Sequence, residues 1–151
     1  MIADKAAILA FLGAIFAASG IALAEGEFGY EGHYSSGEGQ SLTADLTPMA
    51  EKGRYAVSLS TTVAMVGDQP GCGGGIDGEA MFDGTTAMLS VENEGFDPQE
   101  AESPQNMRYC EVKMSVPEEY TLQIEELGGC SYYHGASCSF SGTLMHDAAG
   151  L

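Results

Sequence analysis

The chain has 151 residues and a formal net charge of −17, from 22 acidic and 5 basic residues. A protein this acidic repels nucleic acid and anionic lipid, so no nucleic-acid partner is expected, and it attracts cationic partners at range. The same charge is equally typical of a protein that needs it only for solubility, for example in a salty habitat. The length fits one domain with one hydrophobic core.

The first 24 residues have the pattern of a cleavable signal peptide. Lys5 precedes an apolar run over residues 6–18, and Ala22-Leu23-Ala24 is the small-x-small pattern that signal peptidase reads. This run is shorter than the ~20 residues that a membrane-spanning helix needs, so we expect no stable membrane insertion of the mature chain. We expect residues 25–151 to form a single periplasmic or secreted domain. Loss of Asp4 and Lys5 leaves 21 acidic and 4 basic residues, and the charge stays at −17.

Beyond Glu25 the residues alternate between apolar and polar, and turn residues recur at short intervals. This pattern is typical of an antiparallel sandwich or barrel. We expect an all-β fold, in which an eight-stranded antiparallel meander closes into a small barrel. The expected strands cover residues 28–35, 41–46, 55–65, 72–82, 87–91, 108–114, 120–124 and 138–144, and the one long loop covers residues 93–106.

Two further patterns favour a closed barrel. The segments 30–34 and 140–144 share an aromatic-x-Gly-x-apolar form, which predicts that the first and last strands pair through them. Gly32, Gly78 and Gly142 fall at inward positions, where a strand bends or is closely approached. The inward residues are bulky enough to fill a small barrel: Phe28, Tyr30, Tyr34, Tyr55, Val57, Leu59, Phe82, Leu89, Leu122, Ile124 and Phe140. The third expected strand keeps the same inward parity through Val63 to Met65.

The four cysteines, Cys72, Cys110, Cys130 and Cys138, are an even set in an exported chain. Such a set favours two disulfides over metal ligation. Three pairings are possible, and the shared inward parity of Cys72 and Cys110 is compatible with a bridge between them.

The segment from Cys130 to Cys138 is the main candidate binding element. Its Cys-x3-His-x3-Cys spacing supplies three metal ligands where structural zinc takes four, so a small disulfide ring is favoured and no metal is expected. Such a ring would present aromatic residues on a rigid loop, which gives contact area at little entropic cost. The alternative is an ordinary exposed loop. The candidate binding residues are Tyr132, Tyr133, His134 and Ser137.

Catalysis has little support in the sequence. The chain has no Gly-x-Ser-x-Gly elbow, no His-Glu-x-x-His motif and no phosphate-binding glycine loop. His33, His134 and His146 lie far apart along the chain. We therefore expect neither enzymatic activity nor a cofactor.

Several motifs together resemble a known group of proteins. They are Tyr30-x-Gly-x-Tyr34, the segment 53–59, Cys72 before a glycine-rich stretch, the segment 110–114 and, most distinctively, the ending 129–142. Over residues 28–145 the chain is similar to small β-barrel domains of exported proteobacterial proteins, some attached to lysozyme-inhibitor-like modules. The resemblance implies a lipocalin-like barrel, a periplasmic location, and the disulfides Cys72–Cys110 and Cys130–Cys138.

These observations leave three functions in competition. The first is an exported acidic binding protein that blocks a cationic enzyme such as lysozyme. The second is a carrier of a small apolar ligand inside the barrel, or an envelope-associated protein without catalytic activity. The third is an enzyme with an unrecognised site. The bulky inward residues count against the carrier.

Overall fold

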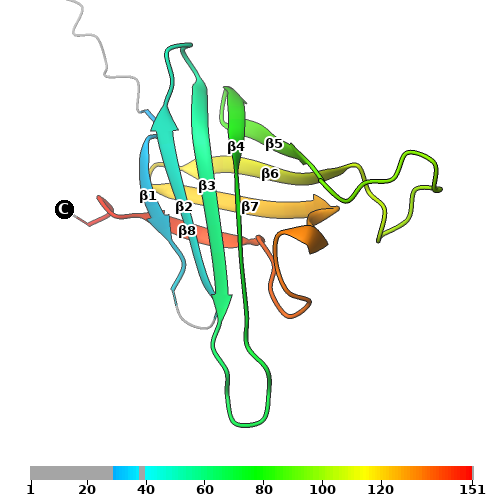
Figure 1. Ribbon diagram of the computed structural model, residues 1–151. Helices are drawn as coiled ribbons and strands as arrows, with labels where there is room; N and C mark the ends of the chain where they lie inside the picture. The colour runs from blue at the N-terminus through cyan, green and yellow to red at the C-terminus, as the bar shows by residue number, and fades with distance from the viewer. Residues whose placement is uncertain (1–28, 38–39, 151) are drawn as a thin grey trace, which may run out of the picture.

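The protein is an all-β barrel in its computed structural model, which describes residues 29–37 and 40–150. Eight antiparallel strands follow one another in chain order, and the last pairs with the first (Figure 1). The expected meander and its closure are therefore confirmed, whereas the expected signal peptide lies outside the described residues. The strands are β1 (Gly32–Ser35), β2 (Ser41–Pro48), β3 (Arg54–Val63), β4 (Cys72–Asp83), β5 (Thr86–Glu92), β6 (Tyr109–Glu118), β7 (Thr121–Gly128) and β8 (Gly142–His146).

Side chains fill the barrel interior, because successive strand residues point alternately inward and outward. The prediction of inward residues is confirmed for Tyr34, Tyr55, Val57, Leu59, Phe82, Leu89, Leu122, Ile124 and Phe140, all of which are buried. Tyr30 packs against this core, and Phe28 lies outside the described residues. The prediction is wrong for Met65, which is 74% exposed. The turn between β3 and β4 projects beyond the rim (bottom of Figure 1), so Met65 has no core to face.

The contact between the first and last strands forms in a different register from the expected one. Tyr34 pairs with His146 and Ser35 with Met145, so the segment 140–144 does not pair with residues 30–34. The last strand also starts at Gly142 rather than at Cys138. Residues 139 and 140 instead bind the Glu126 carboxylate, as described below.

The strands β4 and β5 separate early, and this divergence positions the candidate site. β4 pairs with β3 from Met81 down to Cys72, but its register with β5 ends at Ala80↔Leu89. β5 then continues beside β6 as far as Glu92↔Tyr109. The backbones of β4 below Ala80 and of β5 beyond Leu89 therefore diverge (Figure 1), and we call the region between these unpaired stretches the opening.

The pairing of β1 with β2 generates a prediction on pH dependence. His33 lies opposite Asp45, with its Nδ1 2.7 Å from the carboxylate Oδ1. This hydrogen bond, opposed by desolvation and aided by the charges of Asp45 and Asp147, raises the pKa of His33 above 6.5. The folded protein thus holds the His33 proton more tightly than the unfolded chain does. The stabilisation is fully present below pH 6.5 and is lost as the pH rises through the folded-state pKa.

We expect Asp45→Asn to lower the pKa of His33, measured by following the imidazole resonances in an NMR titration. Because both side chains are exposed, added salt should reduce the difference between the variant and the parent protein. Asp83→Asn, at a distant turn, serves as the control and should leave this pKa unchanged. An unaltered His33 titration in Asp45→Asn would contradict the assigned hydrogen bond.

Candidate functional site

The segment from Gly129 to Ser141 covers the opening between β4 and β5. Gly129 has a φ of 75°, and a Cβ there would overlap the carbonyl oxygen of Tyr109, so only glycine fits. The chain then makes the 3-10 turn η1 (Cys130–Tyr132) and crosses to the glycine-rich start of β4. There the Gly75 N–H donates to the Tyr133 carbonyl at 2.9 Å. A Cβ at Gly74 would overlap the backbone of this segment, which explains why β4 is glycine-rich at this point.

Two disulfides hold the segment, and their pairing differs from the expected one. Cys110 bonds Cys130, and Cys72 bonds Cys138. The expected Cys72–Cys110 and Cys130–Cys138 bridges are therefore wrong, and the small ring from 130 to 138 does not exist. The β6–β7 register places Gly128 opposite Glu111, so Cys130 emerges next to Cys110. The crossing then carries Cys138 to the start of β4. Shared parity does not bring Cys72 near Cys110, because β5 lies between their strands.

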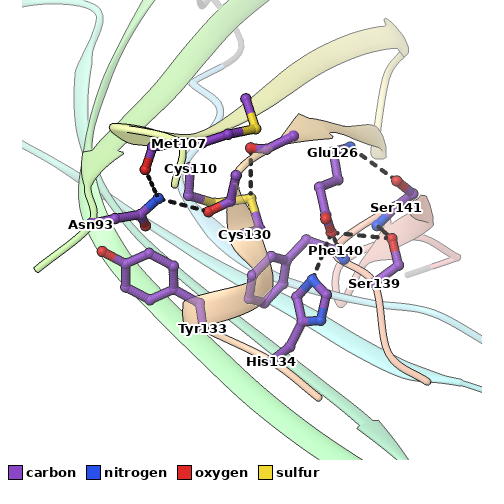
Figure 2. Close-up of a disulfide and its surroundings, with 12 residues drawn as sticks. Asn93, Met107, Cys110, Glu126, Cys130, Tyr133, His134, Ser139, Phe140 and Ser141 are labelled. Carbon is purple, nitrogen blue, oxygen red and sulfur yellow. Dashed lines mark hydrogen bonds and ion pairs between the residues drawn. A yellow bond between two sulfur atoms is a disulfide. The ribbon is translucent and has the colours of Figure 1, made fainter. Parts of the chain in front are cut away.

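The four candidate binding residues therefore do not form one projecting tip. The Tyr133 ring packs against the core, and its hydroxyl donates to the Glu92 carbonyl at 2.9 Å. The His134 side chain is only 8% exposed and meets the Phe140 ring edge to face (Figure 2). Tyr132 is 46% exposed, and Ser137 is exposed. Tyr133 and His134 thus tie the segment to the barrel, while Tyr132 and Ser137 face solvent.

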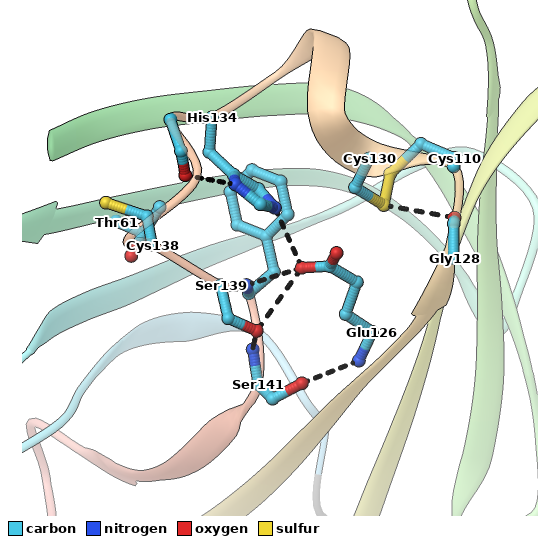
Figure 3. A network of polar contacts seen from close by, with 12 residues as sticks. Thr61, Cys110, Glu126, Gly128, Cys130, His134, Cys138, Ser139 and Ser141 are labelled. Carbon is cyan, nitrogen blue, oxygen red and sulfur yellow. Dashed lines mark hydrogen bonds and ion pairs between the residues drawn. A yellow bond between two sulfur atoms is a disulfide. The ribbon is translucent and has the colours of Figure 1, made fainter. Parts of the chain in front are cut away.

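A carboxylate that sequence reasoning missed organises the underside of this segment. Glu126 Oε2 lies 2.9 Å from His134 Nε2 and accepts a hydrogen bond from the Phe140 N–H at 2.9 Å (Figure 3). The Ser139 hydroxyl donates to the same oxygen at 3.3 Å. His134 Nδ1 lies 2.9 Å from the Gly135 carbonyl oxygen, so the imidazole is held between two oxygen atoms. Glu126 comes directly before a register shift in β7, between Glu126 and Gly128, a feature with no clear sequence signal.

The Glu126 cluster contains a serine, a histidine and a carboxylate, but not in a nucleophilic arrangement. A catalytic serine donates its proton to the histidine, whereas Ser139 donates to the carboxylate that also binds His134. Among residues 29–37 and 40–150, no three His, Cys, Asp or Glu side chains are grouped to hold a metal ion. The same residues contain no helix long and apolar enough to span a membrane.

The long loop between β5 and β6 leans against this segment and is held by buried amides that sequence reasoning also missed. Asn93 Nδ2 donates to the carbonyls of Met107 and Gly129, at 2.8 and 2.9 Å (Figure 2). Asn106 is 5% exposed, and it accepts from the Asp97 N–H and donates to the Asp97 carbonyl. The Tyr132 hydroxyl donates to the Gln105 carbonyl at 3.0 Å. The 16 residues between β5 and β6, 93–108, form no helix or strand, and side chains fix them at several points.

This fixed loop is strongly acidic. Glu94, Asp97, Glu100 and Glu102 lie within it, and no basic residue lies among them. The nearest cation along the chain, Arg108, pairs with Glu92 at 2.9 Å and lies against the Phe96 and Tyr109 rings. Desolvation, and then the charge of Glu94, raise the pKa of the Tyr133 hydroxyl. The disulfide end of the barrel therefore presents negative charge on a stiff frame.

The disulfide assignment is directly testable. Proteolysis of the unreduced protein should release one linked peptide pair containing Cys72 and Cys138 and another containing Cys110 and Cys130, identified by mass spectrometry. In a chain-entropy estimate, loops of 66 and 20 residues stabilise the fold by about 4 and about 3 kcal/mol. Recovery of a Cys130–Cys138 peptide would overturn the crossing path described above.

The Glu126 cluster should matter for stability. Glu126→Ala leaves the Phe140 N–H and the His134 imidazole without their acceptor, which should lower the free energy of unfolding by about 1–3 kcal/mol in urea denaturation. Glu125→Ala, an exposed neighbour on the same strand, is the matched control and should change it by less than about 0.5 kcal/mol. Equal effects of the two substitutions would show that the cluster does not stabilise the fold.

Comparison with known proteins finds no relative of this chain. No protein-family model, no curated protein and no solved structure matches the chain.

Proposed function

We propose that the protein is an exported binding protein that captures a cationic secreted protein, with lysozyme as the leading candidate. The observation that carries this proposal is the acidic loop over residues 93–106, held rigid by Asn93, Asn106 and Tyr132 beside two disulfides. A stiff loop loses little conformational entropy on binding, so more of its interaction energy appears as affinity.

The charge of the whole molecule supports the same proposal. A net charge of −17 speeds encounter with a basic protein, while the loop determines where the partner docks. Both described arginines are already paired, Arg54 with Glu51 and Glu79, and Arg108 with Glu92. Neither arginine forms its ion pair with a carboxylate of the acidic loop.

The filled barrel favours surface binding over carriage of a ligand. Tyr34, Phe140 and Met114 are fully buried among aliphatic side chains along the barrel interior. Tyr132 supplies the loop with an exposed aromatic face whose hydroxyl is already bound to the loop backbone. Aromatic anchors of this kind are enriched at protein interfaces.

Export is part of the proposal. The pattern of residues 1–24, the resemblance to exported proteobacterial barrel domains and the two disulfides all support a periplasmic or secreted location, because disulfides persist in oxidising compartments.

Calorimetry and stopped-flow association of the mature protein with lysozymes of several types test the proposal. We expect binding at low salt and an association rate that falls as salt rises, because screening shortens electrostatic range to about 8 Å at physiological ionic strength. The triple variant Glu94→Gln, Glu100→Gln, Glu102→Gln should slow association by roughly tenfold.

A matched control removes the same number of charges at the opposite end of the barrel, through Glu31→Gln, Asp83→Asn and Glu118→Gln. This control should slow association less than the loop variant does, since only the loop lies at the proposed contact. Absence of heat with every lysozyme at low salt would end the lysozyme assignment. Equal slowing by both triple variants would remove the loop as the docking element.

A further inference from the structure

We propose that the opening between β4 and β5 binds an extended, cationic polypeptide segment as an added β-strand. The inference rests on the proposed function, since it specifies how part of a basic partner is recognised at the disulfide end. It concerns backbone pairing as well as charge, so it can fail while the proposed function stands.

The direction of the β4 backbone is the first argument. The Gly73 carbonyl accepts from the Gly135 N–H, and the Gly75 N–H donates to Tyr133, so both residues turn their backbone groups away from β3. In an antiparallel strand these directions alternate from residue to residue, so Asp77 turns its N–H and C=O to the same side. At Asp77 the register with β5 has already ended. A strand edge therefore faces the opening, and such an edge is a template for pairing with another chain.

The floor of the opening is closed and apolar. A Cβ at Gly78 would meet the Leu89 and Val91 side chains, so these residues pack directly beneath the β4 backbone. Tyr133 spans the lower end, with its carbonyl bound to Gly75 and its hydroxyl bound to Glu92. The hollow above this floor has a volume of about 410 Å³ and is lined by Gly75, Ile76, Asp77, Val91, Glu92, Glu94, Tyr132 and Tyr133. It has the dimensions of a groove for a few residues rather than of a passage into the barrel.

The margins of the hollow select the charge of its occupant. Asp77, Glu92 and Glu94 line it, and the lining includes no basic residue. Glu92 is paired with Arg108, so Asp77 and Glu94 are the carboxylates that attract a cation. The crossing segment already pairs with Gly73 and Gly75, so Asp77 is where an incoming backbone meets the edge of β4. A second copy of the chain is disfavoured, because its charge of −17 would be repelled. The complementary occupant is an extended segment with lysine or arginine at alternate positions.

A synthetic probe tests this recognition. The end-blocked peptide Lys-Val-Lys-Val-Lys should bind the mature protein and should slow hydrogen exchange of the Asp77 amide at least tenfold. Two control peptides carry backbone N-methyl groups, one on the valines and the other on the lysines, so that each lacks the N–H groups of one edge. Charge is identical in all three peptides. The peptide that is methylated on the edge facing β4 should bind at least tenfold more weakly than the peptide that is methylated on the opposite edge.

A pair of variants separates backbone from side chain at the strand edge. Asp77→Asn removes the charge and keeps the N–H, whereas Asp77→Pro removes both. Proline is tolerated where the lost N–H faces away from the paired neighbour, so the β3–β4 ladder should persist. We expect Asp77→Pro to weaken peptide binding at least tenfold more than Asp77→Asn does. If Asp77→Pro fails to fold, the methylated peptides and the exchange measurement on the parent protein still test whether the peptide pairs with the backbone of β4.

The remaining outcomes contradict the inference in distinguishable ways. If basic proteins bind with the expected salt dependence but both methylated peptides bind as well as the parent peptide, the opening is not the site and the proposed function survives. If neither basic proteins nor the peptide bind at low salt, both proposals fall. If Asp77 exchange slows with rising protein concentration in the absence of peptide, a second copy is the occupant.

Discussion

The early separation of β5 from β4 is the constraint on which the rest of this structure depends. A barrel has no free strand edge only if every strand is paired along its length, and here the register ends at Ala80↔Leu89 while β4 continues to Cys72. Part of the uncovered edge is paired by the crossing segment, through Gly73 and Gly75. That segment has little regular structure of its own, so it depends on disulfides and side-chain hydrogen bonds to stay in place.

The chemistry of the covering segment follows from this dependence. Cys130 and Cys138 attach it to β6 and β4, and Glu126 binds it at His134, between the two cysteines, and at the Phe140 N–H, beyond Cys138. The backbone groups of a strand form hydrogen bonds with a neighbouring strand. In this segment, several polar groups instead form hydrogen bonds with the single carboxylate of Glu126. Hydrogen bonds to a charged group contribute about 1.5–3 kcal/mol each, which compensates for the missing ladder. The residues that look most reactive in this region are therefore structural.

The same end of the molecule collects the features suited to binding. The barrel interior is filled, and its far end presents an aromatic group formed by Tyr30, Tyr55 and Phe82. The disulfide end instead carries a stiff acidic loop and a strand edge beside an apolar floor. Rigid backbone and concentrated charge on one surface are the requirements for fast and specific capture of a basic partner. Stability and the proposed recognition thus share the same covalent and hydrogen-bonded framework.

The sequence by itself determined the fold class, the approximate strands and most of the core, because alternation of apolar residues reports directly which side of a strand faces inward. Tyr34, Leu59, Leu122 and Phe140 are buried as that alternation predicts. Alternation is a local signal, however, and it ends where strands leave the barrel, which is why Met65 was placed inward wrongly.

Only the tertiary structure decided the disulfide pairing, the β1–β8 register and the roles of Tyr133 and His134. Each depends on which segments meet across the barrel, and parity along a chain carries no information about the strand lying between two residues. Cys72 and Cys110 share parity but are separated by β5, whereas Cys138 reaches Cys72 only because the crossing segment spans the opening. Glu126 and Asn106 gave no sequence signal, because an acid or an amide gains a structural role only from the donors and acceptors that folding brings within reach.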